Sequence, residues 1–260
     1  MLLPIHHIVL GVADLDASIK DFENLGFVVT PGGIHKGGIS HNALIHFSDG
    51  SFLELFAFRK NLKVNFIRLA DRLGLLKKWK QKEEHAHMPR FMKGFHGEEG
   101  IMDYAVLVKD IEKYKAQIGV EEIGPSRLFS RKRPDGIVLS WKLAFPKDLH
   151  LPFLMSPYVP ELEIDSLLYS HPNGAKGISQ IDIKLENWDT YFQLYQAFFQ
   201  IAPQIGRELK EPKASYAAKG QQIVLKSGPE SLMGGISSIY LKGEIEQEIN
   251  CRNIHILIRK

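Results

Sequence analysis

The chain repeats one order of elements, a strand, a helix and then three further strands, and this repetition limits the folds open to it. In the first copy, a strand over about 5–12 precedes a helix that the Asp14 side chain can cap. A break at about 25–27 leads into a second strand, and two more strands follow over about 41–47 and 51–58. We therefore expect a βαβββ module at the start of the chain.

The same order recurs further along the chain. A strand over 101–108 and a helix over 110–118 precede a hairpin whose turn is 133–136. A weaker third copy begins near 177, and a strand-first fragment begins near 235. Repetition of this kind indicates one structural unit used several times. We predict an α+β fold of repeated βαβββ modules, with two modules in residues 1–170 and a degenerate module in 171–260.

Residues 59–99 form an insert between the first two modules. The apolar residues that fall on one side of a helix there are Phe66, Leu69, Leu73 and Leu76. Basic residues fill most of the other positions, opposed mainly by Asp71. The segment could be a basic amphipathic helix for a membrane surface or an acidic partner, or a helix packed on its own domain with a solvated basic face. We expect the latter, a mainly helical flap over the first module.

Two strands of the first module each carry a polar residue among apolar neighbours. His7 shares a face with Val9, and Glu54 shares a face with Phe52 and Phe56, because side chains alternate across a strand. A carboxylate in this setting is costly to bury without a partner, which a histidine or a bound cation could supply. His7 and Glu54 are therefore candidate metal ligands. The alternative is that Glu54 is a hydrogen-bonded wall residue and His7 a core histidine.

The composition excludes some classes of function but does not identify one. The chain has 260 residues, of which 44% are apolar and 24% charged, and its net charge of +3 is too small to suggest nucleic acid. Cys251 is the only cysteine, so no intramolecular disulfide can form and a reducing compartment fits. No apolar run reaches the length of a membrane span, and the first residues do not resemble a signal peptide. We expect a cytoplasmic protein with neither nucleic acid nor membrane as a partner.

Several short motifs lie within these modules. They are His6-His7-Ile-Val-Leu, Asp14-Leu-Asp, Leu25-Gly-Phe-Val-Val-Thr-Pro-Gly-Gly33, Ser40-His41-Asn42-Ala-Leu-Ile45, Leu53-Glu54-Leu55, Pro134-Asp135-Gly136 and His171-Pro-Asn-Gly-Ala175. Over about residues 5–183 they resemble the glyoxalase-like domain family of the vicinal oxygen chelate superfamily, which includes glyoxalase I and extradiol dioxygenases. The resemblance implies modules that form a curved mixed sheet with a central cleft. It also implies metal ligands on first and fourth strands, and His7 and Glu54 match those positions in one module.

The second module departs from that pattern. Tyr104 occupies its first-strand position, and residues 151–157 offer no carboxylate for its fourth strand. Catalytic metal sites usually keep three protein ligands, so a third would have to come from elsewhere. The candidates for a third ligand are His41, His150, His171 and Gln180.

A group of further residues is expected to contact a substrate. They are His41, Asn42, Tyr104, Arg127, Trp141 and His171. His41 and Asn42 are neighbours on one strand and cannot share a face, and we place His41 near the site and His46 outside it. Arg127 lies on a basic hairpin that could bind a carboxylate or be a solvated tip. Trp141 could be a cleft wall or core residue, and His171 could rim the cleft or belong to a linker.

The leading hypothesis is a metal-dependent lyase or dioxygenase in which Zn, Mn, Fe or Ni is chelated by adjacent oxygens of a small substrate, which could be anionic. Glu54 would be a ligand or, without metal, a general base. The alternative is a metal-free protein that binds or sequesters a small molecule in the same cleft. A homodimer is a further alternative, because this architecture permits modules to be exchanged between chains.

Overall fold

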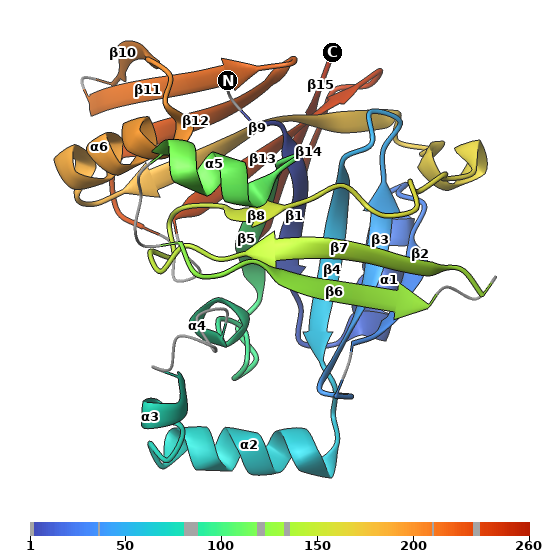
Figure 1. Ribbon diagram of the computed structural model, residues 1–260. Coiled ribbons are helices and arrows are strands. Elements are labelled where there is room, and N and C mark those ends of the chain that lie inside the picture. The colour runs from blue at the N-terminus through green and yellow to red at the C-terminus, as the bar shows by residue number, and fades with distance from the viewer. Residues whose placement is uncertain are drawn as a thin grey trace.

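The protein folds into two mixed sheets with few helices (Figure 1). The structure is a computed structural model, and it describes residues 3–35, 37–80, 88–118, 123–132, 136–209, 211–230 and 235–260. The α+β class expected from the sequence is confirmed.

The first sheet has eight strands in the order β2-β3-β4-β1-β5-β8-β7-β6. Its first module consists of β1 (Ile5–Gly11), α1 (Leu15–Asn24), β2 (Thr30–Ile34), β3 (Ser40–His46) and β4 (Phe52–Phe58). Its second module consists of β5 (Gly100–Leu107), α5 (Ile111–Ile118), β6 (Arg127–Lys132), β7 (Val138–Ala144) and β8 (Phe153–Met155). The antiparallel pairing of β1 with β5 joins the modules, while β1 with β4 and β5 with β8 are parallel pairs within them.

The second sheet has seven strands in the order β10-β11-β12-β9-β13-β15-β14. The strand–helix–three-strand order recurs in β9 (Ala175–Leu185), α6 (Trp188–Phe199), β10 (Gln204–Glu208), β11 (Glu211–Ala218) and β12 (Gln221–Ser227). The chain then continues as β13 (Ile236–Gly243), β14 (Gln247–Cys251) and β15 (Ile254–Arg259). A short 3-10 helix, η2 (Ser166–Tyr169), precedes the second sheet.

One apolar cluster holds the two sheets together. β1 contributes Ile8 and Leu10, β9 contributes Ile181 and Ile183, and α6 contributes Tyr195, and all five are fully buried. Burying a large apolar side chain stabilises a fold by roughly 2 kcal/mol, so this cluster is a main source of stability. The other face of the first sheet, called the inner face below, carries a separate apolar cluster, and the candidate site lies there.

The insert between the first two modules contains α2 (Leu62–Arg72), α3 (Lys77–Lys80) and α4 (Met88–Phe91). Val64 of α2 is fully buried, and Nε of Arg68 donates to the carbonyl oxygen of Phe95 at 2.7 Å. The helix therefore docks by this side. Its predicted apolar stripe faces outward instead, with Phe66 73% exposed, so the packing differs from the expectation. Among the described residues, no helix is long and apolar enough to cross a membrane.

Candidate functional site

His7 and Glu54 lie next to each other on the inner face of the first sheet. β1 and β4 are parallel neighbours, with His7 opposite Phe52 and Val9 opposite Glu54. Nε2 of His7 is 3.7 Å from Oε2 of Glu54, and the two side chains are 6% and 15% exposed. Burial, with a further effect of His6, holds the pKa of His7 well below its ordinary value, so its imidazole is neutral near physiological pH.

A β-bulge at the start of β1 brings His6 into contact with His7. Neighbouring residues of a strand normally point to opposite faces, but the pairing with β5 shifts register between Ile5 and His7. The Nδ1 atoms of the two histidines are 2.9 Å apart, so one ring donates a hydrogen bond to the other. The His6 ring also lies 5.9 Å from Tyr158, and burial together with the charge of His46 lowers the pKa of His6 to about 4.

The Glu54 carboxylate is positioned by β3 and by the hairpin between β2 and β3. Nδ2 of Asn42 donates to Oε1 of Glu54 at 2.6 Å, and Nε2 of His35 lies 3.8 Å from the same oxygen. Nδ1 of His35 is hydrogen-bonded with Oγ of Ser40 at 2.9 Å, which orients the ring. A Cβ at Gly32 would lie 2.0 Å from Oδ1 of Asn42, so a glycine is needed for this close approach.

His46 lies on the same side of β3 as Asn42, because the two are four residues apart along a strand. Its ring is 5.5 Å from that of Phe52, and burial, followed by the charges of Arg131 and His171, lowers its pKa to about 4. Nδ1 of His46 and Oδ1 of Asn42 are buried without a hydrogen-bond partner in the described part of the chain. Buried polar atoms are normally paired, so water or a ligand at this face would complete them.

The second module supplies aromatic side chains and an arginine. The ring of Trp141 on β7 is 5.3 Å from Tyr158 and 6.4 Å from Phe129 on β6. Arg131, two residues after Phe129, donates from Nη1 to the carbonyl oxygen of Gly32 at 2.8 Å. Since β2 and β6 are the two edge strands of the first sheet, this hydrogen bond links its edges and closes the sheet over the site.

The residues expected to bind substrate do not all gather here. Asn42 contacts Glu54 directly, and Trp141 lies in the apolar cluster of the inner face. Arg127 lies at the start of β6, half-exposed, on the same side of that strand as Phe129.

Tyr104 lies on the opposite face of the first sheet. β5 places Ala105 opposite His7 and Tyr104 opposite Ile8, whose side chain points toward the second sheet. Tyr104 is 1% exposed in the cluster between the sheets, and its hydroxyl is 3.2 Å from that of Tyr195. Tyr104, which we expected to contact a substrate, is therefore turned away from His7 and Glu54, because it lies opposite Ile8 and not opposite His7.

His41 and His171 are also placed away from Glu54. Asn42 faces inward, so the adjacent His41 faces the other side of β3. His46, which we expected outside the site, is on the inner face, where we had expected His41. Nδ1 of His171 accepts a hydrogen bond from the Val28 backbone N–H at 2.9 Å, so its Nε2 donates to the carbonyl oxygen of His46 at 2.8 Å. His171 thus connects backbone segments. The spacing of Asn42 and His46 in the sequence predicts that they share one side of β3. No sequence pattern indicated the bulge at His6.

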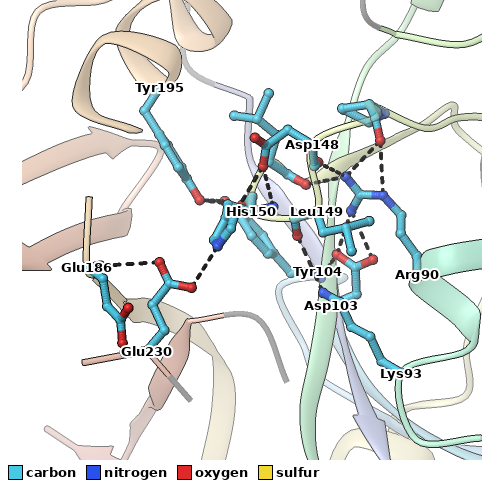
Figure 2. A network of polar contacts seen from close by, with 12 residues as sticks. Arg90, Lys93, Asp103, Tyr104, Asp148, Leu149, His150, Glu186, Tyr195 and Glu230 are labelled. Atoms are coloured by element: carbon cyan, nitrogen blue, oxygen red, sulfur yellow. Dashed lines mark hydrogen bonds and ion pairs between the residues drawn. The ribbon is translucent and has the colours of Figure 1, made fainter. Parts of the chain in front are cut away.

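A second polar network lies where the first sheet meets the second (Figure 2). Nδ1 of His150 pairs with Asp148 and Nε2 with Glu230, each at 2.9 Å. Burial alone would lower the pKa of His150, but the hydrogen bonds and charges of these carboxylates outweigh it and raise the pKa. In the same network, Nη1 of Arg90 lies 3.0 Å from both carboxylate oxygens of Asp103. Neither Arg90 nor Asp103 was singled out by sequence patterns.

The donor chemistry around His7 and Glu54 suits a divalent cation, but the number of donors is small. Cation distances of about 2.0–2.2 Å place two donors that share a cation within about 4 Å of each other. The pairs His7–Glu54 and His35–Glu54 meet this limit, at 3.7 and 3.8 Å. No three His, Cys, Asp or Glu side chains of the described residues gather closely enough to hold a cation by themselves. The candidates for a third ligand all make other contacts or face elsewhere: His41, His150, His171 and Gln180.

Comparison with known proteins identifies the family to which this chain belongs. The glyoxalase-like domain family matches residues 5–199, and the chain belongs to this family. Its fold is that of the vicinal oxygen chelate superfamily. Among curated proteins, none matches the sequence.

Solved structures with little sequence similarity share this fold. A hypothetical protein from Staphylococcus aureus aligns with a TM-score of 0.73 and 16% identity, over 99% of each chain. The Mn(II)-bound glyoxalase from Novosphingobium aromaticivorans aligns with a TM-score of 0.50 and 11% identity, over 93% of this chain and 65% of that one. The 2,3-dioxygenase LapB from Pseudomonas sp. KL28 aligns with a TM-score of 0.52 and 11% identity, over 94% and 76%.

Proposed function

We propose that the inner face of the first sheet binds a small oxygenated substrate with a divalent cation held by His7 and Glu54, in a lyase or dioxygenase reaction. The observation that carries this proposal is the 3.7 Å distance between His7 Nε2 and Glu54 Oε2, two side chains that are largely shielded from solvent. Manganese in the related glyoxalase from Novosphingobium supports a cation of this kind. When bound, the cation would polarise adjacent oxygens of the substrate as a Lewis acid.

The contact between His6 and His7 can give His7 the tautomer that a ligand needs. If Nδ1–H of His7 donates to Nδ1 of His6, then Nε2 of His7 keeps its lone pair on the side of Glu54. A lone pair that faces a carboxylate is unfavourable unless a cation or proton lies between them. Metal-binding histidines commonly donate their other ring N–H to an acceptor in this way.

The remaining side chains can orient the carboxylate and the substrate. Asn42 holds Oε1 of Glu54, which leaves Oε2 on the side of His7. A Glu54 free of metal could take a proton from the substrate as a general base. Trp141 offers a flat apolar surface for a planar substrate, and Arg131 could bind an anionic oxygen in place of its backbone acceptor.

Calorimetric titration of chelator-treated protein with Zn²⁺, Mn²⁺, Fe²⁺ and Ni²⁺ tests the proposal. We expect one saturable site, and His7→Ala and Glu54→Ala should each weaken it by more than about 100-fold because each removes one of two protein ligands. His41→Ala, on the opposite face of the same sheet, is the matched control and should bind like wild type. No saturable site, or a site that survives both substitutions, would refute metal dependence.

A metal-free binding protein is the second candidate, and the small number of donors favours it. In this case the inner face would hold a small molecule by hydrogen bonds and aromatic contacts alone. Glu54→Gln should then keep or raise stability, because it removes a largely buried charge while its amide oxygen can still accept from Asn42. If a cation is bound, the same variant should lose affinity, so one substitution separates the two candidates.

A further inference from the structure

The outer side of α2 carries an apolar ridge that the described part of the molecule leaves uncovered. Leu62, Phe66, Leu69 and Leu73 recur at helical spacing, and Leu75 follows in the turn. Their exposed fractions, in that order, are 89%, 73%, 55%, 65% and 70%. A shallow hollow runs along this side of the helix. Single exposed apolar residues are common, but a contiguous group of this size marks an interaction surface.

This ridge is held in place by the other side of the helix. Val64 is fully buried, and the N-cap Asn61 accepts a hydrogen bond from its backbone N–H at 2.9 Å. Nε of Arg68 donates to the carbonyl oxygen of Phe95, and its guanidinium carbon lies 5.5 Å from the centre of the Phe95 ring. Figure 1 places α2 at one end of the molecule. The ridge is thus presented outward by a docked helix.

Positive charge is concentrated in the segment that carries the ridge. Residues 59–80 contain eight lysines and arginines and one acidic residue, so this segment carries +7 while the whole chain carries +3. The rest of the chain is therefore negative, at −4. Lys63, Arg72, Lys77 and Lys78 are exposed next to the ridge.

An anionic lipid surface fits these observations better than a second copy of the chain. Two ridges packed together would bring their positively charged flanks into contact, which is repulsive. An amphipathic helix with Leu and Phe on one side and basic residues beside them lies in a membrane interface, with its apolar side buried by about 5–10 Å. Basic side chains next to such a helix attract anionic headgroups.

We propose that α2 and the turn after it dock this protein on anionic lipid bilayers, with the ridge among the acyl chains and Lys63 and Arg72 at the phosphates. This revises the expectation of no membrane partner, which rested on the lack of a long apolar run. Because α2 follows β4 directly, docking would hold the first sheet near the bilayer. The proposal does not depend on the chemistry of the inner face.

Flotation of the full chain with vesicles tests the proposal. One set is phosphatidylcholine alone, and the other contains one third phosphatidylglycerol. We expect binding to the anionic vesicles, at least about tenfold weaker binding to the neutral ones, and release between about 0.1 and 0.5 M salt. Phe66→Ser with Leu69→Ser, and separately Lys63→Glu with Arg72→Glu, should each reduce binding by about tenfold or more.

The matched control is Ile205→Ser with Leu209→Ser, which removes two apolar side chains that are 72% and 95% exposed in the second sheet region. It should bind vesicles like wild type, and all variants should keep the wild-type circular dichroism spectrum. No binding to anionic vesicles, equal binding to both sets, or equal loss in the control would overturn the proposal. Self-association that the ridge variant abolishes, without vesicle binding, would assign the ridge to a second copy. Binding to polyglutamate alone would assign it to an acidic polypeptide.

Discussion

Arg90→Met should lower the free energy of unfolding by about 4 kcal/mol, because it removes a buried cation that bonds to several segments at once. Arg90 on α4 is 2% exposed, and its Nη1 lies 3.0 Å from both carboxylate oxygens of Asp103 (Figure 2). Its Nη2 donates to the carbonyl oxygens of Pro146, Asp148 and Leu151 at 3.1, 2.5 and 2.8 Å. The guanidinium therefore joins the insert, β5 and the loop before β8.

The magnitude follows from what methionine leaves behind. Methionine resembles arginine in length but donates no hydrogen bond, so the Asp103 carboxylate, 8% exposed, loses its paired cation. Breaking a buried ion pair by removing one partner costs about 3–5 kcal/mol. Arg90→Met combined with Asp103→Leu should recover about 2 kcal/mol of this loss, because the unpaired charge is gone while the carbonyl oxygens still lack their donor.

Equilibrium urea unfolding, followed by circular dichroism, measures these differences. Arg72→Met, at an exposed position, is the matched control and should stay within about 0.5 kcal/mol of wild type. In a chain of this size, the Arg90→Met midpoint should fall by roughly 10 °C in thermal unfolding. An Arg90→Met loss of no more than about 1 kcal/mol would show that the guanidinium does not hold these segments together.

Three further predictions concern other contacts. The raised pKa of His150 means that its pairing with Asp148 and Glu230 stabilises the fold fully below about pH 6.5 and that this contribution is lost as pH rises through the higher folded-state pKa. His150→Asn should therefore remove about 1–2 kcal/mol at the acid end of a stability–pH profile and little at the alkaline end, and an equal effect at both ends would contradict the pairing. Gly32→Ala should cost about 1–3 kcal/mol and weaken cation binding by displacing Asn42, and unchanged stability and titration curves would argue against that close approach. Tyr104→Phe should cost about 1 kcal/mol, measured by urea unfolding, and leave ligand binding unchanged, whereas altered binding would return this residue to the site.

Local patterns predicted features that depend on residues close together in the sequence. The Asp14 cap is present, with Oδ1 accepting from the Ala17 backbone N–H at 3.1 Å, because capping depends on residues only three apart. Alternation along two strands predicted one shared face for His7 and Glu54, and their contact at 3.7 Å agrees. The same rule could have placed His46 on the same face as Asn42, since it needs only their spacing.

What the sequence by itself determined, then, was the order of elements and the parity of side chains along each strand, since both depend on near neighbours. Only the tertiary structure decided how the strands register and which faces are covered. A bulge brings His6 to His7, the pairing of Tyr104 with Ile8 directs Tyr104 to the other face, and the Arg131–Gly32 hydrogen bond joins edges 99 residues apart. The α2 stripe likewise has the period of a buried face, yet it is exposed, because burial depends on whether another part of the molecule reaches that side of the helix.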